Sequence, residues 1–261
     1  MLSYQHIYHA GNLADVHKHA LLAEMLAYLT AKDKPLTYME THAGRGLYQL
    51  DAPEAVKTGE ARAGIGRVRG AGGLPEDHPL TAALHEVVAG HGPNPYPGSP
   101  LVALNTLRPM DTVHLCELHP QEFAALRVAT ARYPVSLHHQ SGWDAVMSIA
   151  PPTPRRGMVL IDPSYEIAKD YATIPDWIGK LHRKWNVGVI ALWYPILTSG
   201  AHAPMLARLE AAGLPKTVRS EVRFAPAREG HRMIGSGLFV VNAPFGTEQA
   251  AQRVAAMIPR D

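Results

Sequence analysis

The chain has 261 residues, of which 46% are hydrophobic and 18% charged, so its composition is that of a folded protein and excludes bulk disorder. Its single cysteine, Cys116, excludes an intrachain disulfide, and a net charge of +2 neither requires nor excludes a nucleic-acid partner. The longest apolar stretch, residues 187–197, is shorter than the roughly 20 residues that a membrane helix needs, and no signal core begins the chain. We therefore expect a cytoplasmic protein with no membrane partner.

The first hundred residues predict a helix, a strand and then an irregular segment. Apolar residues recur at helical spacing over 13–29, and Asn12 can cap that helix. A short strand follows at 36–40, and then a turn of small residues at 41–46. Residues 51–97 are rich in glycine and proline, show no strand pattern and suggest short helices at 53–69 and 79–88. We interpret 51–97 as a helical insertion in a core formed by 1–50 and 98–261.

From residue 99 onwards strands and helices alternate. Ser99 can cap a helix over 99–107, with Pro100 at its first position. Strands are expected at 112–117, 135–139, 157–162 and 187–193, helices at 120–130, 144–149, within 171–184 and at 205–212, and a final antiparallel pair at 216–224 and 237–242. This alternation predicts an α/β fold with a parallel sheet covered on both faces. Ligands bind such sheets beyond the carboxyl ends of the strands.

Three of these strand ends carry residues that suit a nucleoside, although each has a plainer explanation. Gly44 in the first turn lets a ligand approach the backbone, but an ordinary strand-to-helix turn accounts for it equally well. Glu117 can accept hydrogen bonds from ribose hydroxyls or can simply lie at a helix N-terminus. Ser141 and Gly142 could face an adenine ring, while Asp144 is better explained as a helix cap.

The fourth strand end, Asp162-Pro163-Ser164-Tyr165, carries the sharpest signal. Asp162 could accept a hydrogen bond from the exocyclic amine of a base, and Tyr165 could stack on its ring. Amine methylation needs this arrangement, because the lone pair of adenine N6 is delocalised into the ring and the site must favour its nucleophilic form. An Asp-Pro turn is also common in loops.

Metal and nucleophile sites are weaker explanations. His17 and His19 are two residues apart and face apart on a helix, while His138 and His139 point to opposite faces of a strand. No Cys–His cluster and no Gly-x-Ser-x-Gly motif occurs, so no metal site is predicted. Several groups of basic residues could hold RNA phosphates or form solvated faces. These groups are Arg155 and Arg156; Lys180, Arg183 and Lys184; and Arg219, Arg223, Arg228 and Arg232.

Beyond the strand ends, runs of sequence along almost the whole chain resemble the ribosomal large subunit methyltransferase J family, whose members methylate an adenine N6 in 23S ribosomal RNA. The most specific are the N-terminal runs LSYQH, HAGN and ADVHKH at residues 2–6, 9–12 and 14–19. Others are THAG at 41–44, TGE at 58–60, YPGSP at 96–100, ELHP at 117–120, RG at 156–157 and ALWYP at 191–195. The resemblance implies a Rossmann-like class I methyltransferase fold that uses S-adenosylmethionine.

The resemblance also implies roles for individual residues. Cofactor contacts are implied for Lys18, His19, His42, Gly44, Ser99, Glu117, Ser141, Gly142 and Asp162. Asp162 would be the catalytic carboxylate, Tyr165 the stacking ring, and Tyr4 and His6 substrate contacts. Two residues depart from the family pattern: Ser164 replaces the second proline of Asp-Pro-Pro-Tyr, and Ser141 replaces an aspartate. Both changes keep the groups that the chemistry requires, although they could weaken activity and cofactor affinity.

Three hypotheses follow. The first is an S-adenosylmethionine-dependent enzyme that methylates N6 of one adenine in 23S ribosomal RNA, as a monomer, with the 51–97 insertion gripping the RNA. The second is a DNA adenine-N6 methyltransferase, against which the lack of a visible sequence-reading domain argues. The third is an RNA-binding protein that has lost catalysis, which Ser164 and Ser141 motivate.

Overall fold

A seven-stranded sheet forms the centre of the computed structural model, which describes residues 5–92, 94–167, 169–227 and 230–259. The strands lie in the order β5 (Ser136–His138), β4 (Thr112–Cys116), β1 (Thr37–Glu40), β6 (Gly157–Ile161), β7 (Val189–Leu197), β9 (Met233–Val241) and β8 (Val218–Arg223). The first five are parallel, and β9 is antiparallel to both β7 and β8. The predicted parallel sheet and the final antiparallel pair are both confirmed.

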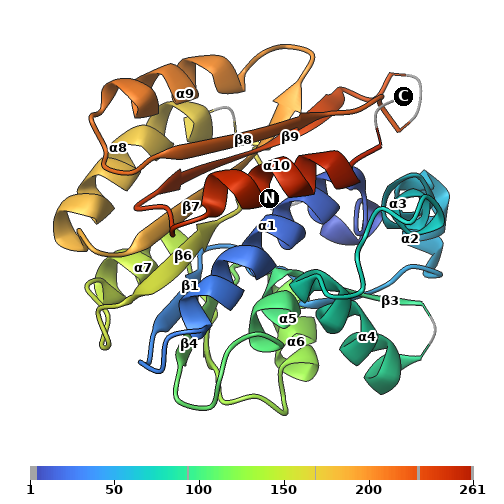
Figure 1. Cartoon of the computed structure of the whole chain (residues 1–261), viewed down its shortest axis with the longest axis horizontal. Helices are drawn as coiled ribbons and strands as arrows, with labels where there is room; N and C mark the ends of the chain where they lie inside the picture. Colours follow the sequence, from blue (N-terminus) through green and yellow to red (C-terminus); the bar gives the residue numbers. More distant parts are fainter. Residues whose placement is uncertain (1–4, 93, 168, 228–229, 260–261) are drawn as a thin grey trace.

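Helices cover both faces of this sheet (Figure 1). One layer holds α1 (Leu13–Thr30), α5 (Ser99–Leu104), α6 (Pro120–Ala129) and α10 (Thr247–Met257); the other holds α7 (Gly142–Ile149), α8 (Lys169–Lys184) and α9 (His202–Ala211). Alternate residues of β6 point to opposite faces of the sheet. Met158 and Leu160 pack into the core under the first layer, and Val159 and Ile161 pack into the core under the second. The expected Rossmann-like α/β sandwich is thereby confirmed.

Helix α1, near the start of the chain, is hydrogen-bonded to the last two strands of the sheet. Asn12 accepts a hydrogen bond from the backbone N–H of Asp15 and caps the helix, as its sequence predicts. On one side of the helix, His17 is hydrogen-bonded to Ser236 on β9 and to Ser220 on β8, at 2.9 Å each. Burial lowers the pKa of His17 to about 3, so its imidazole is neutral. The helix is therefore fixed to the C-terminal hairpin by uncharged hydrogen bonds.

Residues 51–97 are more broken than the sequence predicts. They form α2 (Pro53–Thr58), the single π-turn η2 (Arg62–Gly66), α3 (Arg67–Gly70), α4 (Pro79–His91) and the short strand β3 (Pro95–Pro97). The expected helix over 53–69 is interrupted because Gly59 is left-handed, at φ +68°, and Gly64 has non-helical dihedrals. The expected absence of strands was wrong, since β3 pairs with β2 (Leu47–Gln49).

Three further details differ from the predictions. Gly98, not Ser99, is the N-cap of α5, and the Ser99 hydroxyl donates its hydrogen bond to the buried carboxyl group of Glu40. Helix α7 begins at Gly142, so Asp144 lies in its first turn rather than at its cap. Helix α10, which packs beside α1, was not predicted.

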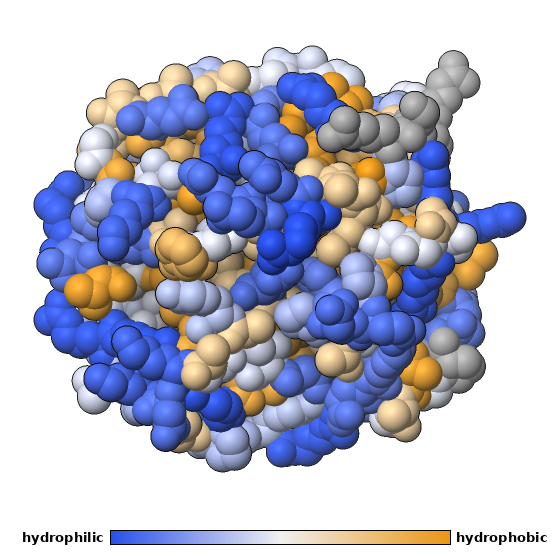
Figure 2. All heavy atoms as spheres, in the orientation of Figure 1, coloured by the Kyte–Doolittle hydropathy of each residue, from blue (hydrophilic) through white to orange (hydrophobic). Residues whose placement is uncertain are grey.

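The face seen in Figure 2 is mostly hydrophilic, with apolar side chains in scattered patches, as expected when the apolar residues fill two internal cores. Among the residues that the structure describes, no helix is long and apolar enough to cross a membrane.

Candidate active site

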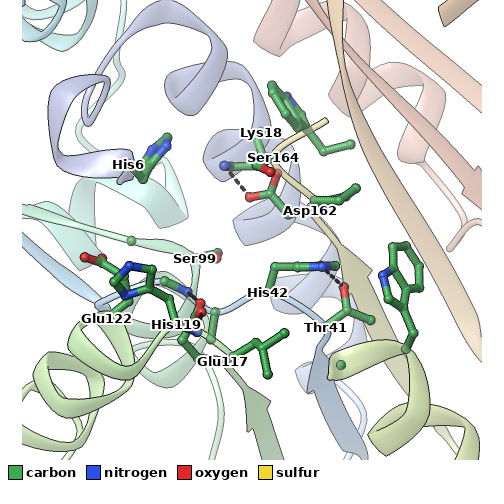
Figure 3. A pocket seen from close by; sticks show the side chains of 18 of the residues that line it. His6, Lys18, Thr41, His42, Ser99, Glu117, His119, Glu122, Asp162 and Ser164 are labelled. Carbon is green, nitrogen blue, oxygen red and sulfur yellow. Dashed lines mark hydrogen bonds and ion pairs between the residues drawn. The ribbon is translucent and has the colours of Figure 1, made fainter. Parts of the chain in front are cut away.

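A cavity of about 280 Å³ lies beyond the carboxyl ends of β1, β4 and β6 (Figure 3). All nine residues predicted to contact the cofactor line it: Lys18, His19, His42, Gly44, Ser99, Glu117, Ser141, Gly142 and Asp162. His6, one of the predicted substrate contacts, lines it as well. These nine residues come from six separate parts of the chain, of which four follow strand ends, as the strand-end rule expects, and two lie on helices α1 and α5.

Glu117 at the end of β4 is held by backbone groups. Its carboxylate accepts hydrogen bonds from the N–H of Gly44, at 2.8 Å, and from the N–H of His119, at 2.7 Å. Gly44 is left-handed, at φ +61°, a conformation that favours glycine. Burial raises the pKa of Glu117 above its ordinary value, although these N–H groups oppose the shift. The arrangement fixes an acceptor at the cavity wall.

Gly142 lies where the chain passes very close to the end of β1. A Cβ atom at this position would fall 1.9 Å from the carbonyl oxygen of Thr41, so no other residue fits without a backbone shift. This close contact brings the first turn of α7, with Ser141 before it, against the turn after β1. Two of the predicted cofactor-binding turns are thereby held together.

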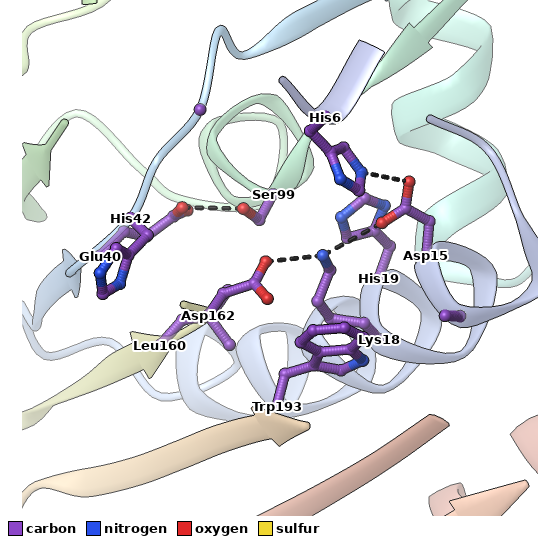
Figure 4. A network of polar contacts seen from close by, with 12 residues as sticks. His6, Asp15, Lys18, His19, Glu40, His42, Ser99, Leu160, Asp162 and Trp193 are labelled. Atoms are coloured by element: carbon purple, nitrogen blue, oxygen red, sulfur yellow. Dashed lines mark hydrogen bonds and ion pairs between the residues drawn. The ribbon is translucent and has the colours of Figure 1, made fainter. Parts of the chain in front are cut away.

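A chain of charges runs along the opposite wall (Figure 4). Lys18 on α1 lies 2.6 Å from Asp162 after β6 and 3.1 Å from Asp15, and His6 lies 2.8 Å from the other oxygen of Asp15. Burial alone would lower the pKa of Lys18, but the carboxylates of Asp162 and Asp15 outweigh it and raise that pKa. Burial likewise would raise the pKa of Asp15, but His6 and Lys18 hold it well below its usual range. Lys18 is therefore a permanent cation between two carboxylates.

A second buried carboxyl group, that of Glu40, has a raised pKa, whereas the pKa of Asp15 is lowered. Glu40, at the end of β1, is fully buried and accepts hydrogen bonds from the hydroxyls of Tyr38, at 2.7 Å, and Ser99, at 2.8 Å. Burial raises the pKa of Glu40 to about 8, because these two hydroxyls compensate only in part. Glu40 is thus mostly neutral near pH 7 and fixes the Ser99 side chain at the cavity.

Two histidines of the cavity, buried His19 and half-buried His42, are also neutral. Burial lowers the pKa of His19 to about 3 and that of His42 to about 4. His19 is hydrogen-bonded to the hydroxyl of Tyr96, and His42 to the hydroxyl of Thr41. Because neither imidazole carries a charge near pH 7, neither repels a cationic ligand.

Tyr165 does not line the cavity. Its side chain is buried, its ring lies 4.6 Å from that of Tyr171, and its hydroxyl donates a 2.6 Å hydrogen bond to the carbonyl of Trp193. Its φ is +57°, which is uncommon for a residue other than glycine. The stacking role predicted for Tyr165 stays a prediction, and the predicted substrate contact Tyr4 lies outside the described residues.

Sequence reasoning missed three residues that help to form the site. Trp193 lines the cavity, and Lys18 Nζ lies 5.2 Å from the centre of its ring. Trp143 also lines it and meets His42 edge-on at 5.1 Å. Asp15 is the buried partner of Lys18. A signal was present for all three: Trp143 follows Gly142, Trp193 ends the expected strand at 187–193, and Asp15 lies in the family-like run at 14–19.

Known proteins match the chain along nearly its whole length. The family model described as "Ribosomal RNA large subunit methyltransferase D, RlmJ" matches residues 33–260. The protein named "Ribosomal RNA large subunit methyltransferase J" from Escherichia coli is 37% identical over 258 residues, covering 97% of this chain and 91% of that one. Its namesake from Haemophilus influenzae is 36% identical over 257 residues, covering 97% and 92%.

A solved structure agrees in fold. The crystal structure of protein LPL1258 from Legionella pneumophila is 35% identical to the chain, superposes with a TM-score of 0.82, and matches 95% of this chain and 91% of that one. The resemblance seen in the sequence is thus confirmed by the family model and by both relatives. The chain belongs to the ribosomal RNA large subunit methyltransferase J family.

Proposed function

We propose that the protein transfers a methyl group from S-adenosylmethionine to N6 of a single adenine in 23S ribosomal RNA, in the cytoplasm. The observation that carries the proposal is the carboxylate of Asp162 in the cavity, held at 2.6 Å by Lys18. Family membership supports the RNA substrate, because both relatives are named as ribosomal RNA methyltransferases. The monomeric state stays a prediction.

The residues of the cavity fit the cofactor. Glu117 is an acceptor fixed at the end of β4 and suits the ribose hydroxyls, while Ser141 and Gly142 border the place assigned to the adenine. Neutral His19 and His42 do not repel a positively charged group. When bound, the cofactor supplies a methyl group on a sulfonium that leaves readily.

We assign Asp162 as the residue that binds the target amine, N6 of the adenine. Lys18 engages its Oδ2, so we assign Oδ1 to accept a hydrogen bond from N6 of the adenine. Such an acceptor favours the nucleophilic form of the amine. The N6 proton then passes to Asp162 or to water. The target base must leave its stack to reach the cavity.

Two aromatic residues are candidates to hold that base. We keep Tyr165 as a predicted stacking residue, which would have to leave its contacts with Tyr171 and Trp193. Trp193 is a second candidate, because its ring already lines the cavity beside Lys18. We keep 51–97 as the insertion that grips RNA, since Arg62, Arg67 and Arg69 are exposed along it.

The test is methyl transfer from labelled S-adenosylmethionine to unmodified 23S ribosomal RNA, with mass analysis of the labelled nucleotide. Asp162→Asn should lower transfer by about a hundredfold or more, and should lower cofactor affinity, to which Asp162 is also assigned, by less. Asp176→Asn, an exposed carboxylate on α8, is the matched control and should transfer normally.

Two outcomes would replace the proposal. Faster transfer to a DNA duplex than to RNA would favour a DNA adenine methyltransferase. Binding of both cofactor and RNA without any transfer would leave an RNA-binding protein, with Ser164 and Ser141 as marks of lost catalysis.

A further inference from the structure

Three side chains of metal-ligand type meet outside the cavity. His9 follows the 3₁₀ turn η1 (His6–Tyr8), Glu60 lies between α2 and η2, and His231 lies just before β9. One ligand atom from each lies within 4.8 Å of the other two. His9 and Glu60 are 51 residues apart, and His231 is far from both, so no local spacing in the sequence signals the cluster.

The distances suit a small divalent cation. His9 Nδ1 lies 2.9 Å from Glu60 Oε1, and His231 Nε2 lies 3.7 Å from the same oxygen. Around a tetrahedral zinc ion, with ligand bonds of about 2.0–2.1 Å, neighbouring ligand atoms are about 3.4 Å apart. The two observed distances lie on either side of that value. The two imidazole rings are nearly parallel, at 20°, with centroids 6.4 Å apart.

Glu60 has the surroundings of a buried ligand. Its side chain is fully buried, and its second oxygen, Oε2, accepts a 3.0 Å hydrogen bond from the side-chain amide of Asn12. Burial raises the pKa of Glu60, but the hydrogen bond and charge of His9 outweigh it, and the net shift is downward. A carboxylate therefore stands between two imidazoles, with its other oxygen oriented by a neighbour, as in many metal sites.

The positions of His9 and Glu60 are fixed before any ion binds. Thr58 donates a hydrogen bond to the carbonyl of Tyr8 at 2.6 Å, and the N–H of Ile65 donates one to the carbonyl of Gly11 at 2.8 Å. A Cβ on Gly64 would fall 2.1 Å from that same carbonyl oxygen, so the two segments pack in direct backbone contact. The side chain of His231 is 16% exposed, between the values for His9 and Glu60, and its buried Nδ1 has no hydrogen-bond partner among the described residues.

We propose that His9, Glu60 and His231 bind one Zn²⁺ ion, with water completing its coordination. Two imidazoles and a carboxylate are a ligand set that zinc uses in proteins. None of the three residues lines the catalytic cavity, so the ion takes no direct part in methyl transfer. It ties the loop before β9 and the 51–97 segment to the N-terminal turn, whose His6 lies 6.5 Å from His9, ring to ring, and lines the cavity.

The test uses the untagged full chain, stripped of metal with a chelator and then titrated with ZnCl₂ or CoCl₂ alone. We expect one equivalent of Zn²⁺ by elemental mass spectrometry, and visible absorption of tetrahedral Co²⁺ that Zn²⁺ abolishes. Glu60→Gln and His231→Gln should each weaken binding by at least about a hundredfold. Asn12→Ser, which keeps all three ligands, should weaken it by about tenfold.

Two control variants make this test specific. His85→Ala removes an exposed histidine on α4, and His114→Ala breaks the His114–His138 pair, whose nitrogens lie 3.1 Å apart. Both controls should bind Zn²⁺ as wild type does. Circular dichroism confirms that each variant folds, and His231→Gln is the decisive one because its side chain is partly exposed.

The proposal is overturned if wild type binds no Zn²⁺ at micromolar concentration, or if His231→Gln and Glu60→Gln bind it unchanged. Loss of binding in His114→Ala would place the ion elsewhere and overturn it as well. Because the readout is metal binding, its failure leaves the proposed methyl transfer untouched.

Discussion

The ammonium group of Lys18 lies 2.6 Å from the carboxylate of Asp162, although 144 residues separate them in the chain. Lys18 is brought by the first helix and Asp162 by the fourth parallel strand, and both side chains are largely buried, at 4% and 15% exposure. The short contact with a fixed cation holds the Asp162 side chain in one direction. This pair therefore presents an oriented hydrogen-bond acceptor to the cavity.

Removing the cation should destabilise the fold. Lys18→Met leaves Asp15 and Asp162 without their shared partner, and breaking a buried ion pair costs about 3–5 kcal/mol. Urea unfolding measures the loss, and Lys180→Met, an exposed lysine on α8, is the matched control. Adding Asp162→Asn to Lys18→Met should recover part of the loss. Equal stabilities of Lys18→Met and wild type would contradict the buried pair.

Stability should fall with rising pH because of Glu40. Its pKa is about 8 in the folded chain against an ordinary 4.5, so the folded state holds one more proton between these values. The free energy of unfolding therefore decreases as pH rises from about 4.5 to about 8, by at most about 1.4 kcal/mol per pH unit. Glu40→Gln should lack this slope when unfolding is measured across the range. A variant with the wild-type slope would exclude Glu40 as the source.

Gly142→Ala should disrupt the cofactor site. The added methyl would lie 1.9 Å from the carbonyl oxygen of Thr41, so the turns after β1 and before α7 must separate. We expect S-adenosylmethionine affinity, measured by calorimetry, to fall by at least about tenfold. Gly179→Ala in α8 is the control, because its nearest contact is a flexible arginine at 3.6 Å and alanine favours a helix. Unchanged affinity in Gly142→Ala would show that the cofactor does not depend on this contact.

Steady-state kinetics can distinguish whether the target base stacks on Trp193 or on Tyr165. If the target base stacks on Trp193, Trp193→Ala should lower kcat/KM for RNA by about ten- to a hundredfold, because a base–aromatic contact is worth about 1–3 kcal/mol. Tyr165→Phe removes only the hydrogen bond to the Trp193 carbonyl and should stay within about threefold of wild type. Normal transfer by Trp193→Ala, together with loss in Tyr165→Ala, would assign stacking to Tyr165 alone.

The insertion should contribute electrostatic affinity for RNA. Replacing Arg62, Arg67 and Arg69 with alanine removes three exposed charges from one segment. If each contacts a phosphate, the slope of log affinity against log salt should fall by about 2–3. A charge-matched triple variant of Arg127, Arg208 and Arg253, on three other helices, should change the slope less. Equal slopes for the two triple variants would remove 51–97 from the RNA interface.

The sequence predicted the parts of the site that obey a topological rule. Glu117 and Asp162 follow strands with clear apolar patterns, and parallel strands end at one edge of a sheet, so their meeting was expected. Asp15 could not be given a role in this way, because its place depends on how α1 packs across the sheet, and Trp193 lies within β7, which runs on to Leu197. Ser99 was assigned a capping role that its sequence allows, but the buried carboxyl of Glu40 engages its hydroxyl instead.

Short and glycine-rich segments were the hardest to predict. Strand β3 has three residues, two of them proline, and is recognisable only through its pairing with β2. The helix expected over 53–69 has a suitable composition, but Gly64 leaves helical geometry where it packs against Gly11. Such breaks arise from contacts between distant segments, and the local sequence carries no signal for them.

The bonds from His17 to Ser220 and Ser236 have a consequence for the order in which the site is made. Helix α1 is synthesised first, yet the strands that fix it are among the last to be synthesised. Lys18 and His19 lie on the helix beside His17, so their positions in the cavity depend on the hydrogen bonds that β8 and β9 supply. A chain cut before β8 would therefore keep the Asp162 turn but lose the bonds that hold Lys18 and His19 opposite it.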